Sequence, residues 1–179
     1  MAEKVVFEHT MDSILRLLER PAPPEQVAAL DALGIDLSKP LLPAYPVAVH
    51  AALIDYVARH RRPDLALDEA QIDLGLAFIA TYNQTLMGRP LKALLWTIGP
   101  HRTLERMNRT FRTANNFTET RLERLGPTRY SLWFNFVSRP GYYQGLVHGT
   151  VAQCGVKGIE VQFSSRQGDE VTYDVSWQP

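Results

Sequence analysis

A basic stretch in the middle of the chain holds the side chains best suited to orient a polar ligand. The segment Arg109-Thr-Phe-Arg-Thr-Ala-Asn-Asn-Phe-Thr-Glu-Thr-Arg121 is expected to run from a helix end into a strand. Arg112 offers a planar guanidinium for a carboxylate or phosphate, and Asn115 and Asn116 offer both hydrogen-bond donors and acceptors. Together these side chains form a candidate site for a polar headgroup.

The same residues also suit a purely structural role. Asparagine tolerates left-handed backbone geometry and is common at helix ends. The pair Asn115 and Asn116 can therefore simply terminate the helix, with Arg112 bound to Glu119 or to a carbonyl at the helix end. The sequence leaves both interpretations open.

Aromatic residues gather in the same half of the chain: Phe111, Phe117, Trp133, Phe134, Tyr142 and Tyr143. Aromatic side chains at strand and helix spacing usually belong to the core. Trp133 is the exception, because the alternation of its strand places it on the face opposite Leu132 and Phe134. A bulky ring on that face indicates a pocket wall or an interface. We therefore predict a ligand-binding site formed by Arg112, Asn115, Asn116, Phe111, Trp133 and Tyr142.

The first 114 residues have the apolar spacing of amphipathic helices. Apolar residues recur at helical intervals within residues 14–18, 27–33, 49–57, 74–82 and 91–97. Gly34 is expected to end the second helix, and Asp68 is expected to cap the fourth. Between the second and third helices, Lys39-Pro-Leu-Leu-Pro-Ala-Tyr-Pro46 predicts an extended, packed connector rather than a domain boundary.

After residue 115 the apolar period changes to two, which indicates half-buried strands. Alternating runs lie at residues 130–136, 159–163 and 171–177, and Gly126-Pro-Thr128 and Gln167-Gly-Asp169 supply turns for two hairpins. We therefore predict one α+β domain over residues 1–179. Its helical layer covers residues 1–114, and a four-stranded antiparallel sheet of ββαββ order covers residues 115–179.

The helix predicted between the two hairpins, at about residues 141–155, carries a stripe of small residues. Gly145 and Gly149 lie one turn apart, with Ala152 close behind. A stripe of this kind lets the helix backbone approach another surface closely, which suits tight packing on the sheet. The alternative is a subunit interface, since small residues at this spacing also suit helix pairs.

Composition argues against several classes of function. The 19 Lys and Arg residues balance the 19 Asp and Glu residues, so the chain has no large positive field to steer nucleic acid. Cys154 is the only cysteine, and neither a secretion signal nor an apolar run long enough to span a bilayer is present, so we expect a cytoplasmic protein. The 5 histidines are scattered outside any nucleophile motif, and we expect no enzymatic activity.

Three separated segments carry a resemblance to a known family: Lys39-Pro-Leu-Leu-Pro-Ala-Tyr-Pro46, Arg102-Thr-Leu-Glu-Arg-Met107 and Phe111-Arg-Thr-Ala-Asn-Asn-Phe-Thr-Glu-Thr-Arg-Leu122. In order and spacing they resemble the domain of unknown function 2378, a family that occurs as many paralogues in myxobacteria. The resemblance runs essentially end to end. It implies no particular activity.

The predicted order of elements carries a more distant resemblance. Gly145-Leu-Val-His-Gly149 in the last helix and Ile159-Glu-Val-Gln-Phe163 in the next strand are similar to the haem-nitric-oxide-binding domain. They are also similar to the vinyl-reductase-type domains and the TRAPP-like vesicle-tethering domains of the same topology. Those relatives hold haem, aromatic effectors or acyl chains between helices and sheet. The resemblance therefore implies a small-molecule sensor or a scaffold.

The metal chemistry of those relatives is not matched residue by residue. Haem sensing needs an axial histidine on the helix before the sheet, and Glu105-Arg-Met-Asn-Arg-Thr-Phe-Arg-Thr-Ala114 contains none. The tyrosine, serine and arginine clamp for haem propionates is not recognisable either. Zinc binding needs several cysteines, whereas Cys154 has only His148 nearby, and a separation of six residues puts the two on different helix faces. We expect neither haem nor zinc.

These features together suggest a non-enzymatic, small-molecule-sensing or regulatory adaptor domain. Its ligand would be an apolar or amphipathic small molecule bound between helices and sheet, and its signal would pass through a homodimer or a partner protein. The alternative is a dimeric scaffold for protein–protein interaction with a filled core. That alternative predicts an exposed apolar or self-complementary surface near Trp133 or the Gly145 helix instead of a cavity.

Overall fold

The computed structural model describes residues 3–82, 84 and 88–178, and residues 1–2, 83, 85–87 and 179 of the predicted domain lie outside this description. The first part of the chain is helical, as predicted. Its helices are α1 (Glu8–Leu15), α2 (Pro24–Ala32), α3 (Val47–Arg61), α4 (Leu67–Tyr82), α5 (Gly88–Glu105) and α6 (Met107–Ala114). Asp68 lies in the first turn of α4 rather than before it.

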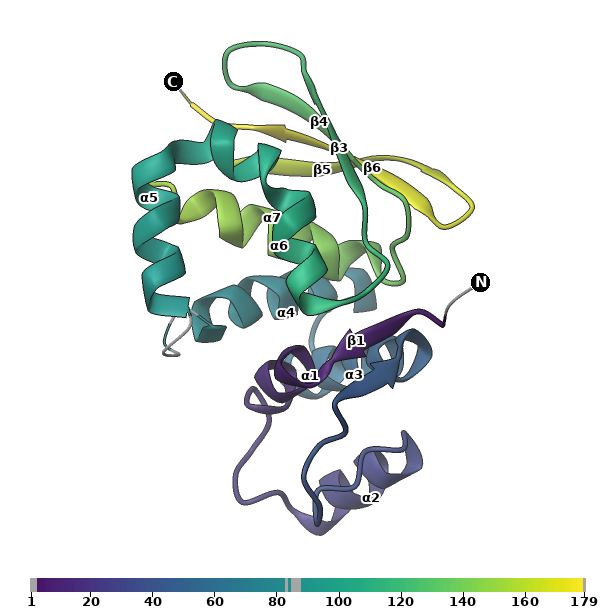
Figure 1. The fold of residues 1–179 in the computed structure, drawn as a ribbon. Coiled ribbons are helices and arrows are strands. Elements are labelled where there is room, and N and C mark those ends of the chain that lie inside the picture. Colours follow the sequence, from purple (N-terminus) through teal and green to yellow (C-terminus); the bar gives the residue numbers. More distant parts are fainter. Residues whose placement is uncertain (1–2, 83, 85–87, 179) are drawn as a thin grey trace.

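The second part of the chain confirms the predicted ββαββ order. Its elements are β3 (Thr120–Arg124), β4 (Arg129–Phe134), α7 (Pro140–Ala152), β5 (Glu160–Gln167) and β6 (Glu170–Ser176). The strands form one antiparallel sheet in the order β3-β4-β6-β5. In Figure 1, α7 lies between this sheet and α4, and α1, α2 and α3 lie beyond α4, on the side away from the sheet.

A second, two-stranded sheet was not predicted. β1 (Val5–Phe7) pairs antiparallel with β2 (Ala44–Pro46), so the proline-rich connector is extended but ends in a paired strand. Each strand has only three residues, which is too short for an alternating pattern to be visible in the sequence. This small sheet brings the start of the chain next to the end of α6.

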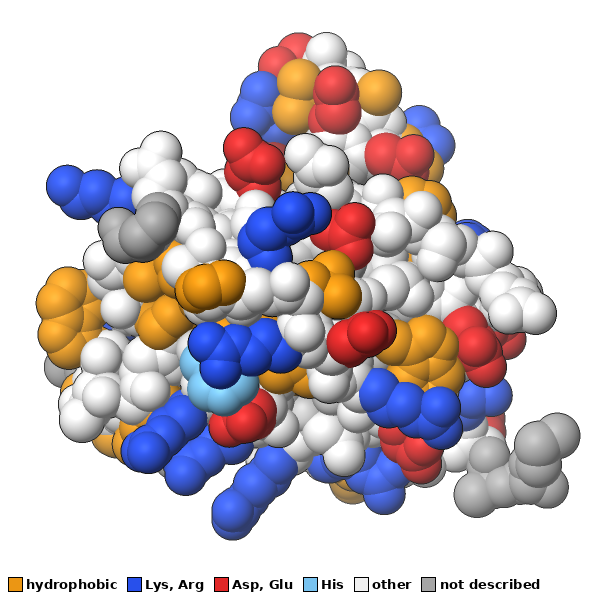
Figure 2. Space-filling view, turned by 90° about the horizontal axis from the view of Figure 1, so that it is seen from above, with side chains coloured by type: hydrophobic (Ala, Val, Ile, Leu, Met, Phe, Trp, Pro, Cys, Tyr) orange, Lys and Arg blue, Asp and Glu red, His pale blue; other side chains and the backbone are white. Residues whose placement is uncertain are grey.

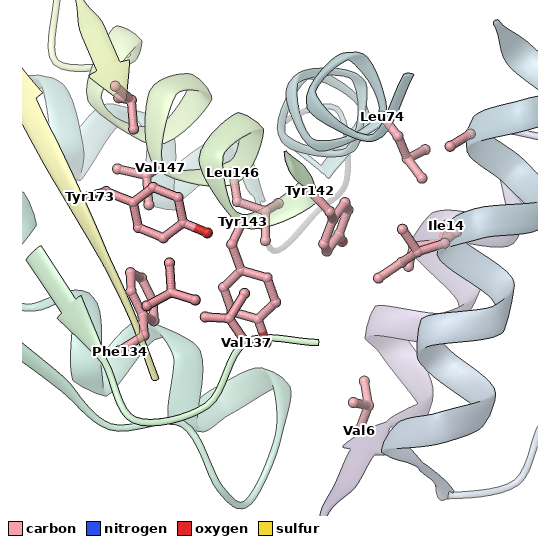
Figure 3. Close-up of a cluster of buried hydrophobic side chains, with 14 of the residues drawn as sticks. Val6, Ile14, Leu74, Phe134, Val137, Tyr142, Tyr143, Leu146, Val147 and Tyr173 are labelled. Carbon is pink, nitrogen blue, oxygen red and sulfur yellow. The ribbon is translucent and has the colours of Figure 1, made fainter. Parts of the chain in front are cut away.

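The alternation in the main sheet explains its core. Tyr130, Leu132 and Phe134 of β4 are buried, and Leu132 faces Tyr173 of β6 across the strand pair. Figure 3 shows Phe134 and Tyr173 meeting Tyr143 and Val147 of α7 in one apolar cluster. The same cluster includes Ile14, Leu53 and Leu74 of the N-terminal helices, so apolar contact is continuous from the sheet into the helical part. Among the described residues, no helix is long and apolar enough to cross a membrane.

The glycine stripe of α7 packs against a helix and not against the sheet. A Cβ atom added to Gly145 would lie 2.9 Å from the Cα of Gly75 on α4 and would overlap the carbonyl oxygen of Ile72. Gly149 contacts Ile79 in the same way, with 3.0 Å between the added Cβ and the Ile79 Cβ. The prediction of helix-on-sheet packing for this stripe was therefore wrong, because α4 of the same chain covers it.

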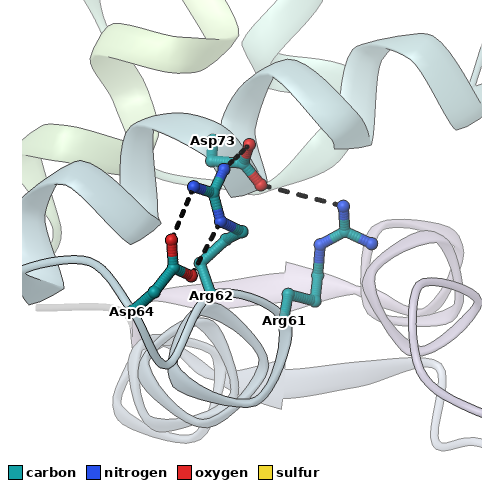
Figure 4. A network of polar contacts seen from close by, with 4 residues as sticks. All are labelled: Arg61, Arg62, Asp64 and Asp73. Atoms are coloured by element: carbon teal, nitrogen blue, oxygen red, sulfur yellow. Dashed lines mark hydrogen bonds and ion pairs between the residues drawn. The ribbon is translucent and has the colours of Figure 1, made fainter.

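Ion pairs join the end of α3 to α4 near this contact (Figure 4). Asp73 of α4 accepts from Arg62 Nη1 at 3.2 Å and lies 3.7 Å from Arg61 Nη2, and Arg62 Nη2 lies 3.0 Å from Asp64 Oδ2. These side chains are partly exposed, so each pair adds little stability by itself. The network lies at the turn between the two helices.

Replacing Gly145 with alanine should therefore destabilise the fold. The added methyl group meets backbone atoms of α4 that cannot rotate away, and we expect a loss of about 1–3 kcal/mol in the free energy of unfolding. Urea denaturation followed by circular dichroism measures this loss. Gly126→Ala is the matched control, because its added Cβ meets only Arg129 Cβ at 3.8 Å. Equal stability of the two variants would contradict the close contact between α4 and α7.

Candidate functional site

A cavity of about 120 Å³ lies where α4, α6 and α7 meet. Its wall is mostly apolar and includes Phe78 of α4, Met107 and Phe111 of α6, and Leu146 of α7. β1, α1, α3 and α5 complete the wall. None of the described wall residues belongs to the four-stranded sheet, so the cavity lies among the helices and not between helices and sheet as predicted.

Three residues of this wall have buried polar atoms without a hydrogen-bond partner among the described residues: His50, Tyr142 and, at its Oε1, Gln153. Both ring nitrogens of His50 on α3 and the hydroxyl of Tyr142 on α7 lack a hydrogen bond to any part of the chain that the structure describes. Their relative exposures are only 4% and 1%, so bulk water does not serve as the partner. The two rings meet edge to face, with 5.9 Å between centroids. A buried polar group left unpaired costs free energy, so this arrangement calls for an explanation.

Burial controls the protonation of this pair. It lowers the pKa of His50 from 6.5 to about 4, with a smaller contribution from the positive charge of Arg139. Burial also raises the pKa of Tyr142 well above its ordinary value. Near pH 7 both groups are therefore neutral. The imidazole then offers one donor and one acceptor, and the phenol offers a donor and an acceptor.

A single carboxylate fixes the helices that carry these groups. Asp55 of α3 accepts two hydrogen bonds from Arg139, at 2.7 Å from Nε and 2.6 Å from Nη2. Gln71 Nε2 of α4 donates to the same carboxylate at 2.8 Å. Arg139 is the N-cap residue of α7, so this charge-assisted contact holds the start of α7, where Tyr142 follows, against α3 and α4.

The asparagine pair of the sequence has a structural role at the edge of the cavity. Asn115 Oδ1 accepts hydrogen bonds from the backbone N–H groups of Phe117, at 3.1 Å, and Thr118, at 2.8 Å, which directs the chain from α6 toward the sheet. Asn116 Oδ1 accepts from Val5 N at 2.9 Å, and its Nδ2 donates to Glu3 O at 2.9 Å. Asn116 therefore attaches β1 to this junction.

The structure brings together only half of the predicted site residues. Phe111, Asn115 and Tyr142 line the cavity. Arg112 and Asn116 are exposed and are not among the described residues of its wall. Binding of a ligand by these side chains stays a prediction.

Trp133 lies on the outer face of the sheet, as its strand alternation predicted, and is also absent from the described wall of the cavity. The guanidinium of Arg121 stacks on its ring, with 4.5 Å to the centroid, and its Nε1 donates to Glu170 at 3.2 Å. The face seen in Figure 2 has charged side chains of both signs between small apolar groups. Trp133 thus contacts neighbouring charged residues instead of forming a pocket wall.

Sequence reasoning missed His50, although a signal was present. His50, Leu53, Ile54 and Val57 are all buried, and their spacing puts them on one face of α3. A histidine that shares the buried face of a helix is expected to be buried, whereas a histidine outside any apolar pattern is expected to lie on the surface. Reading the helical period through His50 would have predicted its burial.

Metal ligands and a reactive thiol are not found near the cavity. Within the described ranges no group of three or more His, Cys, Asp or Glu side chains could hold a metal ion. The Cys154 thiol is buried and shares a hydrogen bond of 3.3 Å with the Thr103 hydroxyl. Its pKa is raised by burial, an effect that the bond to Thr103 partly offsets.

Comparison with known families identifies the chain. The family described as "Protein of unknown function (DUF2378)" matches residues 4–178, so the chain belongs to this family. The family resemblance carried by the three sequence segments is confirmed. No curated protein matches the sequence.

Solved structures of H-NOX domains share the fold over nearly the whole chain. One is an oxygen-binding H-NOX domain related to soluble guanylate cyclases, with TM-score 0.65 and 11% identity over 96% of this chain and 95% of that chain. Another is the Fe(II) unliganded H-NOX protein from K. algicida, with TM-score 0.63 and 14% identity over 97% of each chain. A third, from work on H-NOX activation, has TM-score 0.67 and 11% identity over 94% of this chain and 95% of that chain. The predicted H-NOX-like topology is confirmed, and at these identities the likeness establishes the fold alone.

The unpaired hydroxyl of Tyr142 leads to a stability prediction. We expect the free energy of unfolding of Tyr142→Phe to be equal to that of the wild type or higher, because the substitution removes a buried polar group without breaking a hydrogen bond. Tyr173→Phe is the matched control, since its hydroxyl donates to Pro140 O at 2.8 Å. That variant should lose about 1 kcal/mol. Equal losses in urea denaturation would mean that the Tyr142 hydroxyl has a partner.

The buried His50 should make stability depend on pH. Its pKa of about 4 in the folded state lies below its ordinary value of 6.5, so the unfolded chain takes up the proton first as the pH falls. The contribution of neutral His50 to the free energy of unfolding is complete above about pH 6.5 and decreases toward pH 4. At pH 5 the free energy of unfolding is lower by about 2 kcal/mol.

His50→Gln should remove this part of the pH dependence, because glutamine does not titrate. His60→Gln is the control, since it replaces an exposed histidine of the same helix. Urea denaturation at pH 7 and pH 5 gives the comparison. If His50→Gln loses as much stability as the wild type between these two pH values, His50 is not held neutral in the folded state.

Proposed function

We propose that the protein is a non-enzymatic regulatory domain that binds a small apolar or amphipathic molecule in the cavity among its helices. The observation that carries this proposal is the mostly apolar cavity of about 120 Å³. An apolar cavity of about 150 Å³ is large enough to hold benzene. The H-NOX neighbours support a sensory role by analogy of fold only. The proposed setting is the cytoplasm.

The proposed occupant is not haem. His50 and Met107 line the cavity and are residue types that bind haem iron. A porphyrin, however, is several times larger than the single ring that a cavity of this volume holds. No lysine or arginine is found among the described residues of the wall, so two propionates would remain without counter-charges. In size and charge, the residues present do not fit the group.

A non-enzymatic role is supported by the state of the nucleophile candidates. A reactive cysteine needs a lowered pKa and access to solvent. The Cys154 thiol is buried, and its pKa is raised. Neutral His50 has no hydroxyl or thiol partner to activate among the described residues.

The alternative function is a dimeric scaffold for protein–protein interaction. The surfaces first expected to serve it are engaged within the chain, since α4 covers Gly145 and Arg121 stacks on Trp133. α5 offers a different surface, because Leu94 is 45% exposed and Trp96 is 66% exposed. Large apolar side chains at such exposure favour a contact with another protein. A regulatory domain of the proposed kind would pass its signal through a surface of this type.

Native mass spectrometry of the purified protein, compared with the denatured sample, tests the proposed function. We expect an additional small mass that is lost on unfolding, and Ala114→Phe, which extends a ring from the cavity wall, should abolish it. Ala28→Phe changes an exposed alanine on α2 and should retain it. A ligand present at 100 times its Kd should also stabilise the wild type by about 2.7 kcal/mol.

A bare wild-type mass, together with no stabilisation by a panel of small apolar molecules, would contradict the pocket and favour the scaffold. Haemin tests the excluded cofactor in the same samples. We expect the absorption spectrum after addition of haemin to be the same for the wild type and for Ala114→Phe. A Soret band present only in the wild type would identify the cavity as a haem pocket.

A further inference from the structure

Basic residues are concentrated in one part of a chain whose total charge is zero. Residues 84–118 contain six Lys and Arg residues and a single acidic residue, Glu105. The rest of the chain therefore holds 13 basic and 18 acidic residues. The balanced total hides a local excess of positive charge, and a local excess of this kind attracts anionic partners.

Four arginines of this segment follow one another along α5 and α6. Arg102 lies in the last turn of α5, Arg106 is the N-cap residue of α6, and Arg109 and Arg112 come three and six residues later. Residues three or four apart are neighbours on a helix surface. The Arg106 N–H donates to the Arg102 carbonyl at 3.2 Å, so the two lie one turn apart. All four residues are exposed, and together they are called the arginine row.

The guanidinium groups of the arginine row are not paired within the described part of the chain. No hydrogen bond or ion pair joins any of the four to another described residue. The carboxylate of Glu105 lies instead 3.1 Å from His101 Nε2. Other arginines, such as Arg62 and Arg139, are paired with aspartates. The arginine row is therefore available to carboxylates from outside the chain.

α6 contacts the cavity and also carries most of the arginine row. Met107 and Phe111 belong to the cavity wall, whereas Arg109 and Arg112 are not among its described residues. A partner bound to the arginine row would therefore touch the same helix as a small molecule in the cavity.

The arginine row suits the carboxylates of a protein better than a lipid surface. A guanidinium group forms two parallel hydrogen bonds with a carboxylate, which a partner of fixed geometry can use. A helix that binds a bilayer inserts apolar side chains into it. The exposed residues of α6 are all polar: Asn108, Arg109, Thr110, Arg112 and Thr113. The exposed Leu94 and Trp96 precede the kink of α5 at Gly99 and are not part of the row.

The length of the arginine row limits the size of the segment that it binds. From Arg102 to Arg112 the row spans at most about 15 Å, at the rise of an α-helix. This length matches about five residues of an extended chain. A longer polyanion such as nucleic acid would continue beyond the row over a chain whose remaining residues are mostly acidic among the charged ones.

We infer that the arginine row binds an acidic segment of a partner protein, about five residues long, through hydrogen bonds between guanidinium and carboxylate groups. The inference goes beyond the proposed function, because binding to the row needs no ligand in the cavity. It gives the proposed regulatory domain a partner on the helix that borders the cavity.

Hexaglutamate and hexaglutamine, each labelled with fluorescein, are the probes, and fluorescence anisotropy measures their binding. We expect hexaglutamate to bind about tenfold more tightly than hexaglutamine. The double variant Arg109→Gln with Arg112→Gln should weaken hexaglutamate binding about tenfold, because it removes two charge pairs. The nuclear magnetic resonance signals of the Arg109 and Arg112 Nε atoms should shift when hexaglutamate is added.

The matched control is Arg20→Gln with Arg59→Gln, which removes the same charge from two exposed arginines outside α5 and α6. It should change hexaglutamate binding by less than about twofold. If both double variants weaken binding equally, the peptide responds to net charge and the arginine row is not a site. If hexaglutamate does not bind at all, the arginine row is only a solvated surface.

Two other polyanions test the class of partner. Vesicles of phosphatidylserine and a short duplex DNA are compared with hexaglutamate on the wild type and on Arg109→Gln with Arg112→Gln. If either binds more tightly than hexaglutamate and is lost in this variant, the partner is a lipid surface or a nucleic acid, and the inference is wrong.

Native mass spectrometry separates this inference from the proposed function. Arg109→Gln with Arg112→Gln should retain the additional mass expected for the cavity, because neither residue is in its described wall. Failure of hexaglutamate to bind, with that mass present, overturns the inference and leaves the proposed function standing. Binding of hexaglutamate through the row, without that mass, supports the inference and removes only the proposed function.

Discussion

The close approach of α4 and α7 is the contact on which the rest of the structure depends. Gly75 and Gly145 let the two helix backbones approach so closely that a methyl group added to either glycine would overlap backbone atoms of the other helix. α7 then lies between the sheet and α4, and the apolar cluster continues from the strands into the N-terminal helices. The cavity exists because this contact fixes the spacing of α4 and α7 while α6 closes the other side. A rigid spacing of this kind keeps a void open that flexible side chains would otherwise fill.

Polar contacts fix the same region at its margins. Asp55 joins α3, α4 and the start of α7 through Gln71 and Arg139. At the other margin, Asn115 turns the chain out of α6, and Asn116 attaches β1 to that turn. These groups are satisfied within the chain, in contrast to His50 and Tyr142. The contrast separates side chains whose polar atoms are paired within the chain from two whose polar atoms are buried without a partner among the described residues.

The chain shares the fold of H-NOX domains. The neighbours named for H-NOX share the arrangement of helices and sheet at identities of 10–15%. In this chain the cavity is lined mostly by aromatic and aliphatic side chains, and no lysine or arginine is among its described wall residues. Fold is preserved by the burial pattern, whereas the ligand is decided by a few side chains, so one topology can serve different ligands.

The sequence by itself determined the elements and their order. Helical spacing before residue 115 and alternation after it reflect burial on one face of each element, and that local pattern is written in consecutive residues. It also placed Trp133 on the outer sheet face, and it named Phe111 and Tyr142, which line the cavity. It did not show that Gly145 meets Gly75, that Asn116 binds the chain start, or that His50 lies beside Tyr142. Each of these contacts joins residues far apart along the chain, so it is decided only when the tertiary structure brings those residues together.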